Sequence, residues 1–189
     1  MSICLVANWK LNGSREFNHN WALEFYRNFN GINFSSIGIA PASLYLDHLK
    51  ATLADNAINI GAQNIDLEDA GARTGEISAS MIKDLGCAFC IIGHSERRTL
   101  FHETNQMINQ KIIQANNNSV IPILCIGESA EENQSNDTYN VLEQQIMEAL
   151  DDLNELSCLI IAYEPIWAIG SGKTPNPKEI NSIHEMIKD

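Results

Sequence analysis

The stretch ICLVANWK, at residues 3–10, decides which of two α/β architectures the sequence favours. Residues 3–7 are apolar and rich in β-formers, as in a strand that is covered on both faces. Asn8, Trp9 and Lys10 follow directly, where a dinucleotide-binding sheet would have a G-x-G-x-x-G turn. The absence of that turn favours a parallel barrel over a doubly wound sheet.

Apolar runs of this kind recur along the chain of 189 residues, and helical patterns separate them. The six runs cover residues 3–7, 37–40, 58–61, 89–92, 121–126 and 159–162. Leu46, Leu49 and Leu53 form one helical stripe between them, at a spacing that covers a sheet. An eight-unit (β/α) barrel takes about 250 residues, so this length accommodates about six βα units. The sequence therefore predicts an α/β fold, with a single domain over residues 1–189 that lacks the last two strands of the barrel.

Capping signals predict where two of the helices begin. Ser78 precedes an apolar helical pattern that ends at Gly86, and Asn176 is followed by Pro177 and by a Glu at the capping-box position. Such residues satisfy the free N–H groups of a first helical turn, so we expect helices directly after Ser78 and Asn176.

Composition excludes several classes of partner. The net charge of −12 comes from 24 acidic and 12 basic residues, and a chain so charged repels nucleic acid. No apolar run approaches the roughly 20 residues of a membrane span, and the N-terminus has no basic signal region. We therefore expect no nucleic acid partner, no membrane association and a cytoplasmic location. The five cysteines are odd in number and are predicted to be free thiols.

Polar residues cluster where the predicted strands end. Asn8 and Lys10 follow the first strand, His94 and Glu96 the fourth, and Glu164 the sixth. Other polar or small residues at such ends are Gln63, Asn64, Gly127 and Glu128. Ordinary loop polarity explains one or two of these residues, but not a Lys, a His and a Glu at strand ends that a barrel brings together.

Four blocks of sequence carry a resemblance to a known family: residues 8–10 (NWK), 61–64 (GAQN), 93–98 (GHSERR) and 162–170 (AYEPIWAIG). With their spacing, these blocks resemble the triosephosphate isomerase family from residue 3 to the end of the chain. The resemblance implies a TIM (β/α) barrel. It also implies an aldose–ketose isomerase that interconverts dihydroxyacetone phosphate and glyceraldehyde 3-phosphate in glycolysis and gluconeogenesis. This proton transfer passes through an enediolate and needs no cofactor.

The resemblance assigns a role to each polar residue at the strand ends. Glu164 matches the base that moves the proton, and His94 matches the electrophile that hydrogen-bonds the substrate oxygens. Lys10 matches the cation that binds the anionic substrate and stabilises the enediolate. Asn8 is expected to contribute to substrate binding and, two residues earlier on the same strand, to position Lys10. Glu96 resembles the acid that pairs with this lysine, although a Glu beside two arginines is equally expected to form a plain salt bridge with them.

The segment after Glu164 has the composition of a lid. It consists of Pro165, Ile166, Trp167, Ala168, Ile169, Gly170, Ser171, Gly172, Lys173 and Thr174. Proline stiffens one end, while the glycines allow unusual backbone angles near the tip. The resemblance implies that the Gly170 N–H binds the substrate phosphate and that Ile169 covers the base when the lid closes.

The loop at residues 70–76 (AGARTGE) resembles the segment that inserts into a partner subunit in this family. A homodimer is therefore expected, with Thr74 approaching the other subunit's active site. Glu76 and Arg97 are a candidate pair across the interface. Arg73 stands where family members usually carry an aromatic residue, and its charge is expected either to weaken the dimer or to be satisfied by an acidic residue.

Other features of the sequence suggest different functions. Residues 93–97 approach a G-x-S-x-G nucleophile elbow but end in Arg, and the histidines lack an H-E-x-x-H spacing, so neither a hydrolase nor a metal site is predicted. An inactive truncated fragment of an isomerase and another phosphosugar enzyme on a similar barrel remain alternatives. The family's last two strands carry loops that complete the phosphate site, so a polypeptide of residues 1–189 alone is expected to have little activity.

Overall fold

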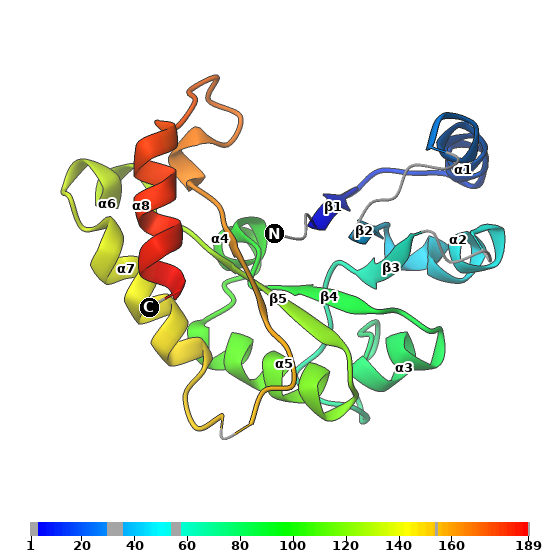
Figure 1. Ribbon diagram of the computed structural model, residues 1–189. Coiled ribbons are helices and arrows are strands. Elements are labelled where there is room, and N and C mark those ends of the chain that lie inside the picture. Colours follow the sequence, from blue (N-terminus) through cyan, green and yellow to red (C-terminus); the bar gives the residue numbers. More distant parts are fainter. Residues whose placement is uncertain (1–3, 30–35, 54–57, 154, 189) are drawn as a thin grey trace.

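A computed structural model describes residues 4–29, 36–53, 58–153 and 155–188. It contains a curled sheet of six parallel strands with helices along its outer side (Figure 1). The strands follow one another in chain order and are β1 (Cys4–Asn8), β2 (Ser36–Ala40), β3 (Asn59–Ala62), β4 (Phe89–Ile92), β5 (Ile121–Ile126) and β6 (Ile160–Tyr163). The prediction of a parallel barrel architecture with about six βα units is confirmed.

The predicted strand bounds are close to those of the structure. β4 and β5 match the predicted ranges, whereas β3 and β6 each begin and end one residue later than predicted. The first predicted strand began at Ile3, which lies outside the described residues. Such shifts arise because strand ends are set by pairing with neighbouring strands, which an apolar run alone does not specify.

Helices connect successive strands and cover one face of the sheet. They are α1 (Arg15–Phe29), η1 (Ser43–Tyr45), α2 (Leu46–Thr52), α3 (Ala79–Asp84), α4 (Ser95–Leu100), α5 (Asn105–Asn117), α6 (Ala130–Gln134), α7 (Thr138–Ala149), η2 (Ile166–Ala168) and α8 (Pro177–Lys188). The predicted caps are present: Ser78 Oγ accepts from Met81 N, and Asn176 Oδ1 accepts from Lys178 N. A cap of this kind stabilises a helix by about 1 kcal/mol.

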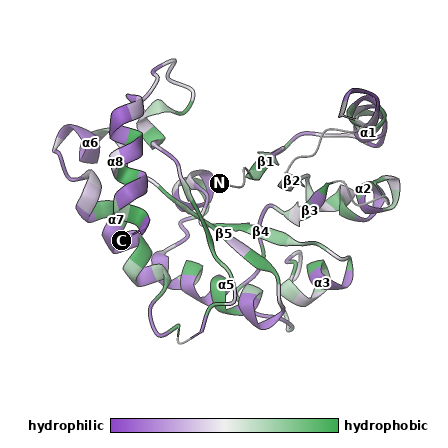
Figure 2. Ribbon diagram, in the orientation of Figure 1, coloured by the Kyte–Doolittle hydropathy of each residue, from purple (hydrophilic) through white to green (hydrophobic). Residues whose placement is uncertain are grey.

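Two layers of core explain why the strands are apolar throughout. In β4, Cys90 and Ile92 pack against the helices, while Phe89 and Ile91 belong to the cluster on the inner face of the sheet. β4 is accordingly coloured in the green of hydrophobic residues in Figure 2. The predicted helical stripe of Leu46, Leu49 and Leu53 is buried in the outer layer.

The aromatic ring of the inner layer, that of Phe89, lies next to two glycines. A Cβ built on Gly38 would lie 2.7 Å from the Phe89 ring, and one built on Gly61 would lie 2.3 Å from it. Small residues on β2 and β3 therefore make room for the aromatic side chain of β4, which lets the sheet curl around it.

β1 and β6 form the two ends of the sheet, and within the described residues they do not pair with each other. Leu5 of β1 is 58% exposed. No helix in the described part of the chain is long and apolar enough to cross a membrane. The cysteines are free thiols, as predicted, with Cys4 and Cys158 exposed and the other three buried.

Candidate functional site

Lys10 lies just beyond the end of β1, in a left-handed backbone conformation with φ +52°. Asn8 Oδ1 accepts a hydrogen bond from the Lys10 backbone N–H (2.9 Å). Gln63 Nε2 donates to the carbonyl oxygens of Lys10 (2.9 Å) and Ala40 (2.8 Å). The expectation that Asn8 and Lys10 share one strand was wrong, because the chain turns after Asn8. Asn8 instead positions Lys10 through its main chain, and these bonds offset the cost of about 1 kcal/mol or more that a left-handed residue carries.

The ammonium of Lys10 points across the end of the sheet to the fourth βα unit. Its Nζ lies 2.8 Å from Glu96 Oε1, so the pair predicted from the sequence is present. The Lys10 ammonium holds the pKa of the Glu96 carboxyl below its usual range. Glu96 is therefore an anion at neutral pH that orients this cation.

His94 caps the N-terminus of α4 with its side chain. Its Nδ1 accepts from the backbone N–H of Glu96 (3.2 Å), and its Nε2 lies 3.1 Å from Glu164 Oε1. A ring nitrogen that accepts a hydrogen bond carries no proton, so this contact places the ring N–H on Nε2. His94 thereby presents an N–H donor toward Glu164.

Glu164 follows β6 directly, and both of its carboxylate oxygens are occupied. Oε1 contacts His94, and Oε2 accepts from the backbone N–H of Ser95 (3.2 Å). Burial, and then the Glu164 carboxylate, raise the pKa of the neighbouring Cys125 thiol. The ends of three strands thus bring together a continuous chain of contacts from Lys10 through Glu96 and His94 to Glu164, which we call the polar cluster.

Arg98 fixes the backbone next to the polar cluster by binding two carbonyl oxygens. Its Nε donates to the carbonyl oxygen of Gly93 (2.8 Å), and its Nη2 donates to that of Cys125 (3.2 Å). Burial lowers the pKa of this guanidinium. Arg98 therefore ties the end of β4, immediately before His94, to the end of β5. The sequence motif located this arginine but gave no indication of these partners.

The lid segment is folded mainly on itself. η2 lies at its start, Gly170 and Gly172 have φ of +68° and +72°, and Ser171 Oγ donates to Ala168 O (3.0 Å). Ile169 is 48% exposed. Within the described residues, no hydrogen bond joins Gly170 to the polar cluster. The tip of the lid segment and the polar cluster are therefore not joined by a hydrogen bond among the described residues.

The base of the lid is anchored on a buried carboxylate that sequence reasoning left without a role. Glu128 is fully buried and accepts from Tyr163 Oη (3.0 Å to each oxygen) and from Trp167 Nε1 (2.7 Å). Burial and the Glu128 charge raise the pKa of the Tyr163 hydroxyl. The only sequence signal was a polar residue close after a buried strand.

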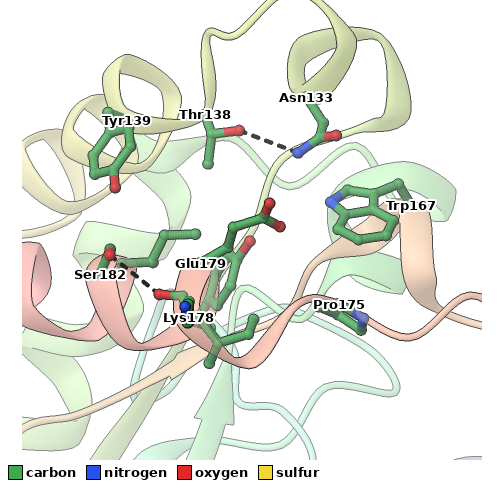
Figure 3. A pocket seen from close by; sticks show the side chains of 11 residues that line it. Asn133, Thr138, Tyr139, Trp167, Pro175, Lys178, Glu179 and Ser182 are labelled. Carbon is green, nitrogen blue, oxygen red and sulfur yellow. Dashed lines mark hydrogen bonds between the residues drawn. The ribbon is translucent and has the colours of Figure 1, made fainter.

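A cavity of about 250 Å³ lies beside this anchor (Figure 3). It is lined by Trp167 and Pro175, near the two ends of the lid, and by residues of α7 and α8 that include Thr138, Glu179 and Ile183. None of the residues of the polar cluster lines it. The cavity therefore belongs to the base of the lid, while the polar cluster lies at the ends of the strands.

The loop at residues 70–76 is exposed, and its charge is balanced within the chain. Arg73 Nε lies 2.5 Å from Asp66 Oδ1, so the unexpected arginine is satisfied by an acidic residue. Thr74 and Glu76 are exposed. Arg97 donates from Nε to Glu103 Oε1 (2.5 Å), so its guanidinium already has an acidic partner within the chain. The described residues contain no group of three or more His, Cys, Asp or Glu that could hold a metal ion.

Comparisons with known proteins give a consistent result. A family model described as triosephosphate isomerase matches residues 3–189. A protein of Nitrosococcus oceani named triosephosphate isomerase is 40% identical over 186 residues, covering 97% of this chain and 74% of its own length. Proteins of that name from Baumannia cicadellinicola and Photorhabdus laumondii are 43% and 40% identical, covering 97% and 98% of this chain and 73% of each relative. The chain thus spans about three-quarters of the length of these relatives.

Proposed function

This chain belongs to the triosephosphate isomerase family, and we propose that Glu164, His94 and Lys10 are the residues with which it catalyses the isomerisation. The reaction interconverts dihydroxyacetone phosphate and glyceraldehyde 3-phosphate, which is a step of glycolysis and gluconeogenesis. A proton moves between adjacent carbons through an enediolate, so the site needs a base, an electrophile and a cation.

One observation carries the assignment: Glu164 and His94 face each other at 3.1 Å, and Glu96 links Lys10 to the same cluster at 2.8 Å. A carboxylate has two oxygens that can reach neighbouring carbons. A neutral imidazole donates its N–H to a substrate oxygen as negative charge develops there, and a nearby ammonium stabilises that charge further. The three groups together meet the requirements of an enediolate mechanism.

The hydrogen bonds of Glu164 imply a change of partners during catalysis. Both oxygens are engaged by His94 and Ser95 in this structure. We expect substrate binding to displace the carboxylate from these donors, which exchanges its contacts for a substrate carbon and frees the His94 Nε2–H for a substrate oxygen. The same exchange removes stabilising hydrogen bonds from the carboxylate and so makes it a stronger base.

Asn8 and the lid have supporting roles in this proposal. Asn8 contributes to the substrate site by holding the main chain of Lys10. The Gly170 N–H binds the substrate phosphate after the lid moves, and Ile169 then excludes water from the base. The hydrogen bond from Trp167 to Glu128 is the anchor about which residues 165–174 would move.

We further propose that the chain forms a homodimer. Leu11 and Leu44, which follow β1 and β2, are 97% and 81% exposed, and a second copy would remove these side chains from water. Because Arg73 is paired with Asp66, its charge does not oppose such an interface. Thr74 would then approach the other subunit's active site, with Glu76 and Arg97 as a pair across the interface.

The cytoplasm is the proposed compartment. Cys87, Cys90 and Cys125 are buried free thiols, and burial raises the pKa of each of them. Unpaired cysteines of this kind suit a reducing environment.

A coupled assay with each triose phosphate tests the function, using the longest form of the chain that its source produces. Turnover in both directions supports the isomerase. Inertness toward both triose phosphates contradicts it, and turnover of a different phosphosugar would favour another enzyme on the same barrel. A parallel assay of Thr74→Arg, with sedimentation to measure mass, tests the dimer: the variant is expected to be monomeric, whereas a monomeric parent would contradict the dimer.

A further inference from the structure

A side chain on α7 clamps the backbone next to the proposed base. Oε1 of Gln145 accepts from Gly127 N (2.9 Å), and Nε2 of Gln145 donates to Gly127 O (3.0 Å). Both ends of the amide are therefore used on one residue. Gln145 fixes the position and the orientation of the Gly127 main chain, although it lies 18 residues further along the sequence.

Gly127 in turn packs directly against the main chain of Glu164. A Cβ built on Gly127 would lie 1.9 Å from the carbonyl oxygen of Glu164 and 2.9 Å from its carbonyl carbon. The φ of Gly127 is not in the left-handed region, so a lack of space, rather than backbone strain, requires glycine here. A displacement of the Gly127 backbone toward Glu164 would consequently push Glu164 out of place. A displacement away from it would leave a gap beside Glu164.

Hydrogen bonds on both sides of Gly127 transmit its position to the segment around Glu164. Glu164 N donates to Ile126 O (2.7 Å), and Ile166 N donates to Glu128 O (3.2 Å). Gly127 lies between these two acceptors and makes its own hydrogen bonds to Gln145. Gln145 of α7 thus fixes the backbone that follows β5. That backbone in turn binds the residues that follow β6 through hydrogen bonds to Glu164 and Ile166.

We infer that Gln145 is a positioning residue, which fixes Gly127 and through it the direction in which the Glu164 carboxylate projects from the sheet. The inference rests on the proposed function, because it assigns Gln145 a role relative to the proposed base. This role differs from a general contribution to stability, because in the part of the chain that the structure describes the Gln145 side-chain amide binds only Gly127, and the Gly127 backbone contacts Glu164 directly.

Gln145→Met tests this role, because methionine has a similar length and makes neither hydrogen bond. The matched control is Gln144→Met, on the exposed side of the same helix. We expect kcat of the Gln145 variant to fall about tenfold or more while KM stays within about twofold, because misplacing the base weakens the transition state more than substrate binding. An unchanged kcat, or a loss confined to KM, overturns the inference.

Amide hydrogen exchange supplies a measurement that requires no turnover. In Gln145→Met, exchange at Glu164 and Ile166 is expected to accelerate about tenfold or more relative to the parent, while the amides of β2 keep their rates. Equal acceleration throughout the sheet would mean a merely structural role and would overturn the inference. If the parent chain does not isomerise triose phosphates, the proposed function fails, and the exchange pattern still decides whether Gln145 holds this backbone.

Discussion

The Nε2 atom of His94 lies 3.1 Å from Oε1 of Glu164, and the next residue, Ser95, donates its backbone N–H to Oε2 at 3.2 Å. Two consecutive residues after β4 therefore hold both oxygens of the proposed base. The carboxylate has to leave at least one of these donors before it reaches a substrate carbon. The energetic balance between these contacts and the substrate contacts governs how effective the base is.

Glu164→Asp is expected to lower kcat about 10²-fold or more and to change KM only a few-fold. The substitution keeps the negative charge but retracts the carboxylate by one methylene, which misplaces the base relative to the substrate carbons. Steady-state kinetics in both directions measures the effect. Glu131→Asp, at an exposed position of α6, controls for the shortened side chain. A change confined to KM would show that Glu164 is not the base.

Lys10→Met is expected to reduce kcat/KM about 10²-fold or more, with losses in both substrate binding and kcat. The ammonium serves the bound phosphorylated substrate and the developing negative charge alike, and methionine keeps much of the side-chain length without the cation. Lys188→Met, exposed at the end of α8, is the matched control. Inhibition by a phosphate-bearing substrate analogue that is equally strong in Lys10→Met and in the parent would contradict this role.

Asp66→Asn tests the pair with Arg73 through its pH dependence. Burial alone would raise the pKa of Asp66, but the Glu68 N–H and Arg73 outweigh it, and the pKa lies below the usual 3.8. A carboxyl with a depressed pKa stabilises the fold above its unfolded pKa and loses this contribution as pH falls through the folded value. The variant should therefore lower the free energy of unfolding at pH 7, and the effect should be small because the Arg73 side chain is exposed to solvent.

Urea denaturation of the parent and of Asp66→Asn between pH 7 and pH 3 measures this difference. It should remain constant down to about pH 5 and shrink below that value, as the unfolded and then the folded carboxyl take up protons. A difference that grows as the pH falls would contradict the depressed pKa.

Asn18→Leu is expected to stabilise the protein. Asn18 is fully buried in α1, and neither its Oδ1 nor its Nδ2 has a hydrogen-bond partner within the described residues. An unpaired buried amide costs about 1–3 kcal/mol, which an apolar side chain avoids. Asn20→Leu, at an exposed position of the same helix, corrects for the higher helix propensity of leucine. The free energy of unfolding should rise by about 1 kcal/mol more for Asn18→Leu than for the control. A smaller gain than that of Asn20→Leu would indicate that the amide is satisfied.

Much of the polar cluster could be predicted, because a parallel barrel brings the ends of its strands together. Lys10, His94 and Glu164 were found as chemically matched residues after three separate strands, and their roles came from a family resemblance. Their partners were harder to foresee. The bond from Ser95 to Glu164 joins residues 69 positions apart, and nothing in the local pattern indicates which oxygen is used.

Two residues to which the sequence assigned no role act on segments far from them in the chain, Glu128 through side chains and Gln145 through a main chain. Glu128 and Gln145 hold Trp167 and Gly127 from positions 39 and 18 residues away. Neither forms a motif with its neighbours in the chain. Their importance depends on the packing of α7 and β6 against the end of β5, which creates geometry that a linear pattern does not contain.

The sequence by itself determined the alternation of strands and helices, the helix starts after Ser78 and Asn176, and the strand ends at which polar residues gather. These features depend on periodicity and on capping within a few residues, which are local properties. Only the tertiary structure decided that Lys10 leaves the strand in a left-handed conformation, that Glu164 lies against Gly127, and that Glu128 holds Trp167. These depend on the register between strands and on the space left between backbones, because both are set by contacts between residues far apart in the chain.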